Sequence, residues 1–190
     1  MKKKYSQPNF YHFSETPILL SRWIDQYGES SDFVLDGFSG SGVLGLELGM
    51  LPKFIKAKFV LLEKQEDFTT HLDYNVEHFG IKQRYQKVIC DFFTFESKDK
   101  FDAIIFNPPY FDVNEGRASK DYKRDECHRI VESIEDILTK SSELLKIGGQ
   151  VFFSYKTQKK IQNRYDDLKL IKAQRLLHEK ESFYFFKKFN

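Results

Sequence analysis

FDAIIFNPPYF, residues 101–111, is the stretch that decides the fold of this 190-residue chain. The apolar run 103–106 predicts a strand that is buried on both faces, as in a parallel sheet. Pro108 and Pro109 remove two backbone donors and fix φ, so the strand must end there. The sequence therefore predicts a rigid corner at the carboxyl end of a strand, where open α/β sheets bind their ligands.

The groups at this corner suit an amine. The side-chain oxygen of Asn107 and the carbonyl oxygen of Pro108 can accept both hydrogens of an –NH2 group. Tyr110 offers a flat ring that can stack on the plane carrying that group. We therefore assign Asn107, Pro108, Pro109 and Tyr110 to a candidate catalytic corner.

A glycine-rich turn precedes this corner in the sequence. Residues 33–36 predict a short buried strand ending in Asp36, and Gly37 to Gly42 then lead into an apolar helix. Strand, glycine-rich turn and helix let a ligand approach the backbone closely at a helix N-terminus. The turn makes Asp36, Phe38, Gly40 and Gly42 candidate cofactor-binding residues.

The next two predicted strands are followed by acids. Residues 59–63 predict a strand ending in Glu63, 27 residues after Asp36, near the spacing of an acid that binds both ribose hydroxyls. Glu63 alternatively caps the helix predicted over residues 67–80. Residues 85–90 predict the third strand, after which Asp91 accepts an adenine amino group and Phe92 packs on the ring, or Asp91 is a turn residue before a core Phe.

The rest of the chain completes a Rossmann-like α/β fold in a single domain, residues 1–190, with an N-terminal arm over residues 1–16. We expect a helix from Pro17 to Tyr27 with Thr16 as its N-cap, a loop over 112–124, and a helix over 130–145 ended by Gly148 and Gly149. A strand (151–155), a helix (156–167) and a hairpin (170–177 and 182–189) follow. Together they predict a seven-stranded, mostly parallel sheet with its last strand reversed.

Composition narrows the class of protein. Cys90 and Cys127 lack the spacing of a zinc site or a disulfide framework and indicate a reducing compartment. We expect no metal, no membrane-spanning segment and no secretory signal, hence a cytoplasmic protein. The net charge is +2, but residues 146–190 carry 11 Lys/Arg against 4 Asp/Glu. This basic quarter faces an anionic partner or is a solvated surface.

The constellation suits an adenosine cofactor without phosphates. Glu63 suits the ribose, Asp91 the adenine, and the glycine-rich turn the remaining chain. The sequence contains no GxxxxGK[ST], which argues against a nucleoside triphosphate. A charged adenosine compound of this kind is S-adenosylmethionine. We also count Asn107 among the candidate cofactor-binding residues.

These residues give the chain a resemblance to class I S-adenosylmethionine-dependent methyltransferases. NPPY after the fourth strand resembles the amino-methyltransferases, which methylate exocyclic nitrogens of adenine or cytosine, or the side-chain amide of glutamine. YHFSETPILLS (residues 11–21), Phe111 directly after NPPY and the GR-x-S loop (116–119) resemble the bacterial valine-tRNA adenine-N6 methyltransferases. The resemblance implies an RNA substrate, methylated on an adenine beside the anticodon of valine tRNA.

A flipped adenine would enter past aromatic and basic side chains. Phe13 and Phe111 are candidates for the entrance. Arg117, Lys123 and Arg124 in the long loop either meet phosphates or are solvated.

Three departures keep other acceptors open. DGFSGSG (residues 36–42) resembles the DLFAGSG turn of the ribosomal-RNA guanine-N2 methyltransferases, although their DPPY and RPT motifs are missing here. Thr16 stands where the tRNA family usually has Asp, and Cys127-His128-Arg129-Ile130 stands where it usually has A-R-H-E. The alternatives are a ribosomal-RNA guanine-N2 enzyme, a protein glutamine methyltransferase, and a non-catalytic RNA-binding module with a retained fold. The oligomeric state stays open.

Overall fold

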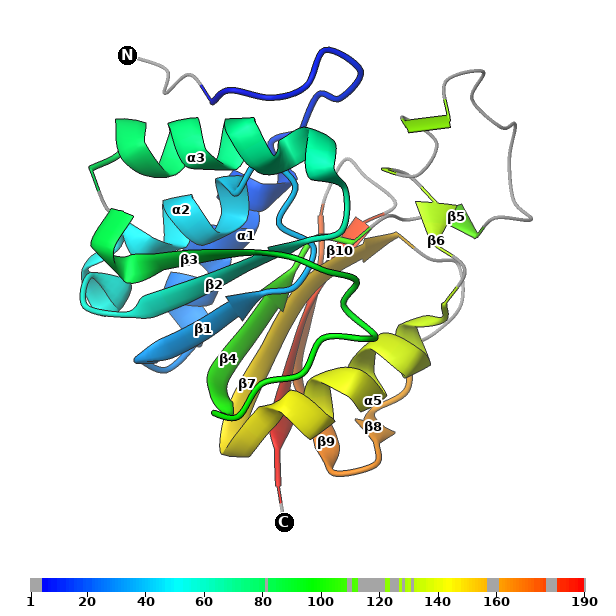
Figure 1. Ribbon diagram of the computed structural model, residues 1–190. Helices are drawn as coiled ribbons and strands as arrows, with labels where there is room; N and C mark the ends of the chain where they lie inside the picture. Colours follow the sequence, from blue (N-terminus) through cyan, green and yellow to red (C-terminus); the bar gives the residue numbers. More distant parts are fainter. Residues whose placement is uncertain are drawn as a thin grey trace.

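The computed structural model describes residues 5–80, 82–108, 111–112, 122–123, 127, 129–130, 132–156, 161–176 and 181–189, with the backbone alone at 111–112 and 129–130. Helices and strands alternate along residues 16–89, and strands predominate in the described part of the chain after them (Figure 1). They are α1 (Thr16–Tyr27), β1 (Phe33–Asp36), α2 (Val43–Gly49), β2 (Lys58–Glu63), α3 (Thr69–His78), β3 (Tyr85–Ile89), β4 (Phe101–Phe106), β5 (Phe111–Asp112), β6 (Arg129–Ile130), α5 (Ile134–Leu144), β7 (Leu145–Lys156), β8 (Arg164–Tyr165), β9 (Leu168–Arg175) and β10 (Glu181–Lys188).

One twisted sheet organises these elements. Its strand order is β3-β2-β1-β4-β7-β10-β9-β8, and the first five strands are parallel to one another. β10 runs antiparallel to both β7 and β9. The predicted Rossmann-like class with a reversed last strand is therefore confirmed, while the two-residue strand β8 adds an eighth strand to the predicted seven. β5 and β6 form a separate parallel pair.

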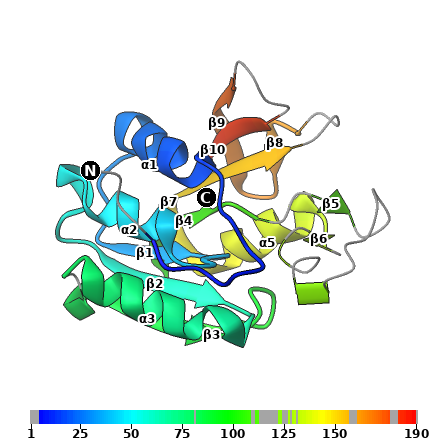
Figure 2. The ribbon, with the colours of Figure 1, turned by 90° about the horizontal axis from the view of Figure 1, so that it is seen from above.

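Helices cover the two faces of the sheet unequally. α1, α2 and α3 pack on one face and α5 on the other, as the view from above shows (Figure 2). Between β3 and β4 the chain forms no helix, and the rings of Phe92, Phe93 and Phe95 pack against the α5 side of the core instead. Aromatic rings thus fill part of a layer that a helix would otherwise occupy.

β4 lies in the middle of this sandwich, as its sequence predicts. Ala103 and Ile105 face the core under α1 and α2, whereas Ile104 and Phe106 face the core under α5. The four side chains are at most 1% exposed. A strand with apolar residues at successive positions buries all of them only where both faces of the sheet are covered.

Three expectations about local structure were wrong. The N-cap of α1 is Glu15, and the hydroxyl of Thr16 donates to Glu181 Oε2 (3.0 Å) instead. α5 begins at Ile134 behind a capping box of Ser133 and Asp136, so Ile130 belongs to β6. Gly148 and Gly149 do not end this helix but lie within β7, where Gly148 has φ of 80°.

The helix predicted over residues 156–167 is the fourth correction. Residues 161–167 contain β8 and no helix, while 157–160 lie outside the described residues. The Tyr165 hydroxyl accepts from the Gln162 N–H (2.9 Å), and Asp166 has a positive φ of 48°. This turn pairs β8 with β9, which a helix would prevent.

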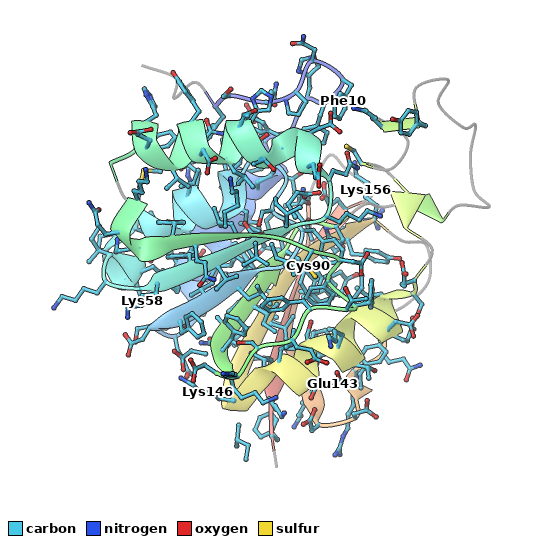
Figure 3. All side chains as sticks on the ribbon, viewed as in Figure 1. Phe10, Lys58, Cys90, Glu143, Lys146 and Lys156 are labelled. Carbon is cyan, nitrogen blue, oxygen red and sulfur yellow. The ribbon has the colours of Figure 1, made fainter. Side chains whose placement is uncertain are left out.

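The described helices include none that is both long and apolar enough to cross a membrane. Most of the predicted loop 112–124 lies outside the described residues. The carboxyl ends of the parallel strands, marked by Cys90 after β3, lie at the end of the sheet opposite Lys58 and Lys146 (Figure 3).

Candidate active site

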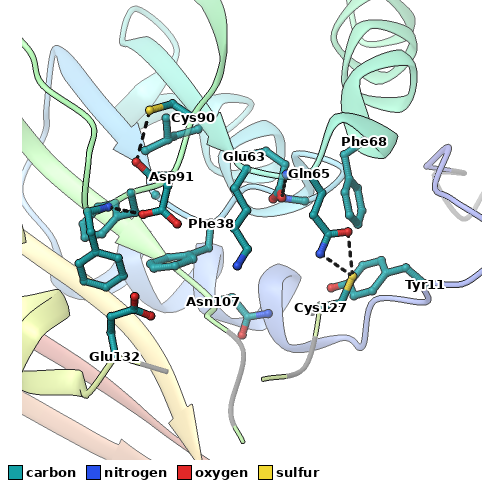
Figure 4. A pocket seen from close by; sticks show the side chains of 16 residues that line it. Tyr11, Phe38, Glu63, Gln65, Phe68, Cys90, Asp91, Asn107, Cys127 and Glu132 are labelled. Carbon is teal, nitrogen blue, oxygen red and sulfur yellow. Dashed lines mark hydrogen bonds between the residues drawn. The ribbon is translucent and has the colours of Figure 1, made fainter. Parts of the chain in front are cut away.

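A cavity opens at the carboxyl ends of β1, β2, β3 and β4. Several predicted site residues meet there: Phe38, Gly40, Glu63, Asp91, Phe92 and Asn107 all line it (Figure 4). The loops that follow four different strands therefore converge on one space, the place where open α/β sheets bind ligands.

Glu63 joins the end of β2 to the glycine-rich turn. Its Oε2 accepts from the Gly40 N–H (2.8 Å), and its Oε1 accepts from the Gln65 N–H (2.9 Å). Burial raises the pKa of Glu63, and the backbone hydrogen bonds act in the opposite direction. A carboxylate has about four acceptor positions, so Glu63 can still accept a hydrogen bond from a group in the cavity.

Asp36 and Gly42 lie beneath the cavity rather than in its wall. Asp36 is 1% exposed, and its Oδ2 accepts from the Gly45 N–H (3.0 Å) in the first turn of α2. Burial raises its pKa to about 7. Gly42 is the N-cap of α2 with φ of 80°, and a Cβ there would lie 2.9 Å from Leu72 Cδ2. Both residues support the turn that the cavity uses.

Asp91 and Phe92 form the wall on the β3 side. Asp91 Oδ1 accepts from the Phe93 N–H (2.8 Å), the bond of a turn residue, while Asp91 also lines the cavity. The Phe92 ring is 3% exposed and lies so close to Gly37 that a Cβ there would be 2.9 Å from it. Its centroid is 5.1 Å from that of Phe38. On this side the cavity is therefore bordered by an acid and a pair of aromatic rings.

Asn107 brings the predicted corner to the same space. Its Oδ1 accepts a hydrogen bond from the hydroxyl of Ser154, a fully buried residue of the neighbouring strand β7. Pro108 is buried, whereas Pro109 and Tyr110 lie outside the described residues. Ser154 was not singled out from the sequence, although it is the polar residue within the apolar strand of residues 151–155.

The other predicted substrate contacts either do not line the cavity or lie outside the described residues. Phe13 does not line it and packs edge to face on Tyr5, with centroids 5.5 Å apart. Lys123 pairs with Asp67 (2.5 Å) near the start of α3. The structure describes only the backbone of Phe111 and does not describe Arg117 or Arg124.

The sequence did not indicate several residues of the cavity wall. Tyr11 comes from the N-terminal arm and meets the ring of Phe68 edge to face, at 5.5 Å and 77°. Cys127 contacts the side chain of Gln65 (3.6 Å). Cys90 and Glu132 complete this group. Aromatic residues before a helix and single cysteines have no spacing that marks a site, so a sequence pattern would not find them.

Comparisons with known proteins agree with this geometry. A family model described as "Conserved hypothetical protein 95" matches residues 20–185. A tRNA1(Val) (adenine(37)-N6)-methyltransferase of Bacteroides thetaiotaomicron is 36% identical over 96 residues, 50% of this chain and 38% of that protein. The enzyme of that name from Glaesserella parasuis is 28% identical over 120 residues, 63% of this chain and 49% of that protein. The chain thus spans half or less of the length of these two relatives.

A solved structure shows the fold independently. The SAM-dependent O-methyltransferase of Thermotoga maritima has a TM-score of 0.65 at 16% identity, covering 100% of this chain and 69% of that chain. At this identity the likeness shows the fold alone. The reaction has to be inferred from the residues of the site.

Proposed function

The chain belongs to the family described as "Conserved hypothetical protein 95", and from this premise we propose that it is an S-adenosylmethionine-dependent N-methyltransferase acting on the N6 of an adenine in tRNA. The observation that carries the proposal is that one cavity unites Glu63 and Asp91 with Asn107. The first two suit an adenosine and the third suits an amine. We place the reaction in the cytoplasm. The proposed target is an adenine beside the anticodon of valine tRNA.

The charge of the cavity favours this cofactor over a nucleotide. Among the described residues, its walls carry the carboxyl groups of Glu63, Asp91 and Glu132 and one basic side chain, that of Lys64. An excess of acids repels phosphates and attracts a cation such as a sulfonium. Glu63 would bind the ribose, Asp91 the adenine amino group, and Phe38 and Phe92 the plane of the adenine.

The reaction needs positioning more than a strong base. When bound, the cofactor supplies an electrophilic methyl group. The adenine amine is a weak nucleophile because its lone pair is delocalised into the ring. Asn107 Oδ1 and the Pro108 carbonyl would accept its two hydrogens and favour a more tetrahedral nitrogen aimed at the methyl group. Holding two reacting groups in this geometry accounts for much of an enzymatic rate.

Ser154 would fix the orientation of the acceptor. A carbonyl oxygen accepts two hydrogen bonds, so the bond from Ser154 to Asn107 Oδ1 is compatible with a second one from the amine. The target base must leave its stack to reach this corner. Tyr110, directly after the corner in the sequence, is our candidate for stacking on it.

The assay uses the purified chain, methyl-labelled S-adenosylmethionine and bulk tRNA from a strain that lacks the enzyme. We expect N6-methyladenine in the nucleoside digest, detected by mass spectrometry. Methylguanine from ribosomal RNA, or label in protein glutamine, would instead support the alternative acceptors. Label in none of these would refute the methyltransferase, and retained RNA binding would then favour the non-catalytic module.

Asn107→Ala tests the acceptor. We expect kcat to fall by about 10²- to 10³-fold, as for the loss of a preorganised transition-state contact. Cofactor affinity measured by calorimetry should change by less than about threefold, because Asp91 and Glu63 remain. Asn163→Ala, at an exposed residue before β8, is the matched control. If the Asn107 variant kept its turnover, the acceptor role would be wrong.

A further inference from the structure

The described part of the N-terminal arm, residues 5–15, crosses the side of the molecule that carries α2 and α3 before it enters α1. In the view from above, it runs past α2 and α3 and over the carboxyl ends of the strands (Figure 2). The arm contains no helix or strand, so side chains on other elements must hold it. One of these side chains also links the arm to the cavity.

Asn75 of α3 is the residue that makes this link. Its side chain is fully buried, and its Oδ1 accepts from the Ser6 N–H (2.8 Å). Its Nδ2 donates to the Ser6 carbonyl (2.9 Å) and to the Ser41 carbonyl (2.9 Å). Ser41 belongs to the glycine-rich turn. The side-chain amide of Asn75 therefore binds both backbone groups of Ser6 in the arm. It also binds the glycine-rich turn below the cavity.

Further contacts hold the arm close to Asn75. The Tyr5 hydroxyl donates to Glu47 Oε1 of α2 (2.5 Å), and the Tyr5 ring packs on Phe79 with centroids 5.0 Å apart. The Ser6 hydroxyl lies 2.7 Å from His71 Nδ1 of α3. The start of the arm is thus tied to both helices that follow the cavity-forming strands β1 and β2.

The far end of the arm forms part of the cavity. Tyr11 lines it and packs edge to face on Phe68, which precedes α3 and also lines it. Burial of Tyr11 raises the pKa of its hydroxyl, which therefore stays neutral. Tyr11 follows Ser6 by only five positions. The hydrogen bonds between Asn75 and Ser6 therefore limit how far the Tyr11 ring can move away from the cavity.

We propose that Asn75 is a positioning residue for the cofactor site, holding the arm so that Tyr11 closes the cavity over the bound cofactor. This inference rests on the proposed function for the identity of the ligand. It makes arm docking and cofactor binding thermodynamically linked, so each must strengthen the other by the same factor.

Two variants of Ser6 test the hydrogen bonds between Asn75 and the arm without changing any residue of α3. Ser6→Pro removes the N–H that donates to Asn75, whereas Ser6→Ala removes the hydroxyl and keeps both backbone bonds to Asn75. One hydrogen bond of this kind changes an equilibrium by about two- to tenfold. We expect Ser6→Pro to raise the Kd of S-adenosylhomocysteine by about five- to tenfold, mostly through faster dissociation, and Ser6→Ala to change it by less than about twofold.

Hydrogen exchange of the unmodified chain is the second measurement and needs no variant. S-adenosylhomocysteine should slow exchange of the Ser6 and Tyr11 amides, the latter of which donates to the Pro8 carbonyl (3.0 Å). Unfolding temperatures measured alongside show whether Ser6→Pro has altered the fold. A merely structural role for Asn75 would leave the dissociation rate of the ligand unchanged in a folded Ser6→Pro protein.

The outcomes separate the inference from the proposed function. If the unmodified chain does not bind S-adenosylhomocysteine, the proposed function fails. If it binds, but the two Ser6 variants bind equally well and exchange in the arm does not respond, the inference about Asn75 is overturned while the proposed function stands.

Discussion

Replacing Asp36 with Asn should make the protein more stable, increasingly so as the pH rises. Asp36 is 1% exposed, Gly45 donates to its Oδ2, and its Oδ1 has no hydrogen-bond partner in the described part of the chain. The ionised form is therefore buried with little compensation. Asn has the same shape, carries no charge, and keeps an oxygen for the Gly45 N–H.

The size of the effect follows from proton linkage. The folded pKa is about 7, against an ordinary value of 3.8. At pH values between these two pKa values, the folded carboxyl keeps a proton that the unfolded carboxyl has lost. The stabilisation of the folded state by this proton is complete at low pH and is lost as the pH rises towards 7. When the folded and unfolded pKa values differ by one, the difference is worth about 1.4 kcal/mol, so the loss here is about 4 kcal/mol in total and about 3 kcal/mol above pH 5. The Asn side chain has no such dependence.

Urea unfolding of both proteins at about pH 5, 6, 7 and 8 measures the difference in unfolding free energy. We expect the advantage of Asp36→Asn to grow by about 3 kcal/mol across this range. Asp99→Asn, at an exposed acid, is the control for a general change of charge. A difference for Asp36→Asn that does not vary with pH would refute the reasoning.

Three further predictions concern the site and its support. Ser154→Ala should lower kcat by about tenfold and leave the cofactor Kd unchanged, because it frees the orientation of Asn107; an equal loss in cofactor affinity would contradict this. Glu63→Gln should raise the cofactor Kd at least about tenfold in calorimetry, since a buried charged acceptor is lost; unaltered affinity would exclude the ribose role. Gly49→Ala should cost about 1–3 kcal/mol in urea unfolding, because the new Cβ would lie 1.9 Å from the Tyr85 hydroxyl. Adding Tyr85→Phe should recover part of that cost, and strictly additive losses would argue against the clash.

The sequence predicts best where local pattern and burial agree. The run before Asn107 is apolar at successive positions, which only a covered strand explains, and β4 has these properties. The position of Asp36 was also accessible in principle. Side chains alternate along a strand, so Asp36 faces the same side as Val34, which packs under the helices. That alternation directs Asp36 beneath α2 rather than into the cavity.

Contacts between distant residues account for what the sequence did not predict. Thr16 was expected to cap its own helix, but its partner Glu181 lies 165 positions away. Asn75 is one polar residue in an ordinary amphipathic helix, and only the folded arm shows that its side chain bonds to three backbone groups. Gly148 suggested a helix end because glycine often stands there, yet β7 accommodates its positive φ.

The place of β10 in the sheet has a consequence for the synthesis of this chain. β10 contains the last described residues to join the sheet, but it lies between β7 and β9 rather than at an edge. Until residues 181–188 have left the ribosome, β9 has no neighbour through which it can join β7. The parallel half of the sheet can form as it emerges, but the complete sheet must wait until residues 181–188 are free to fold. Loss of residues 181–188 would therefore leave a gap inside the sheet, between β7 and β9, and not a shorter edge.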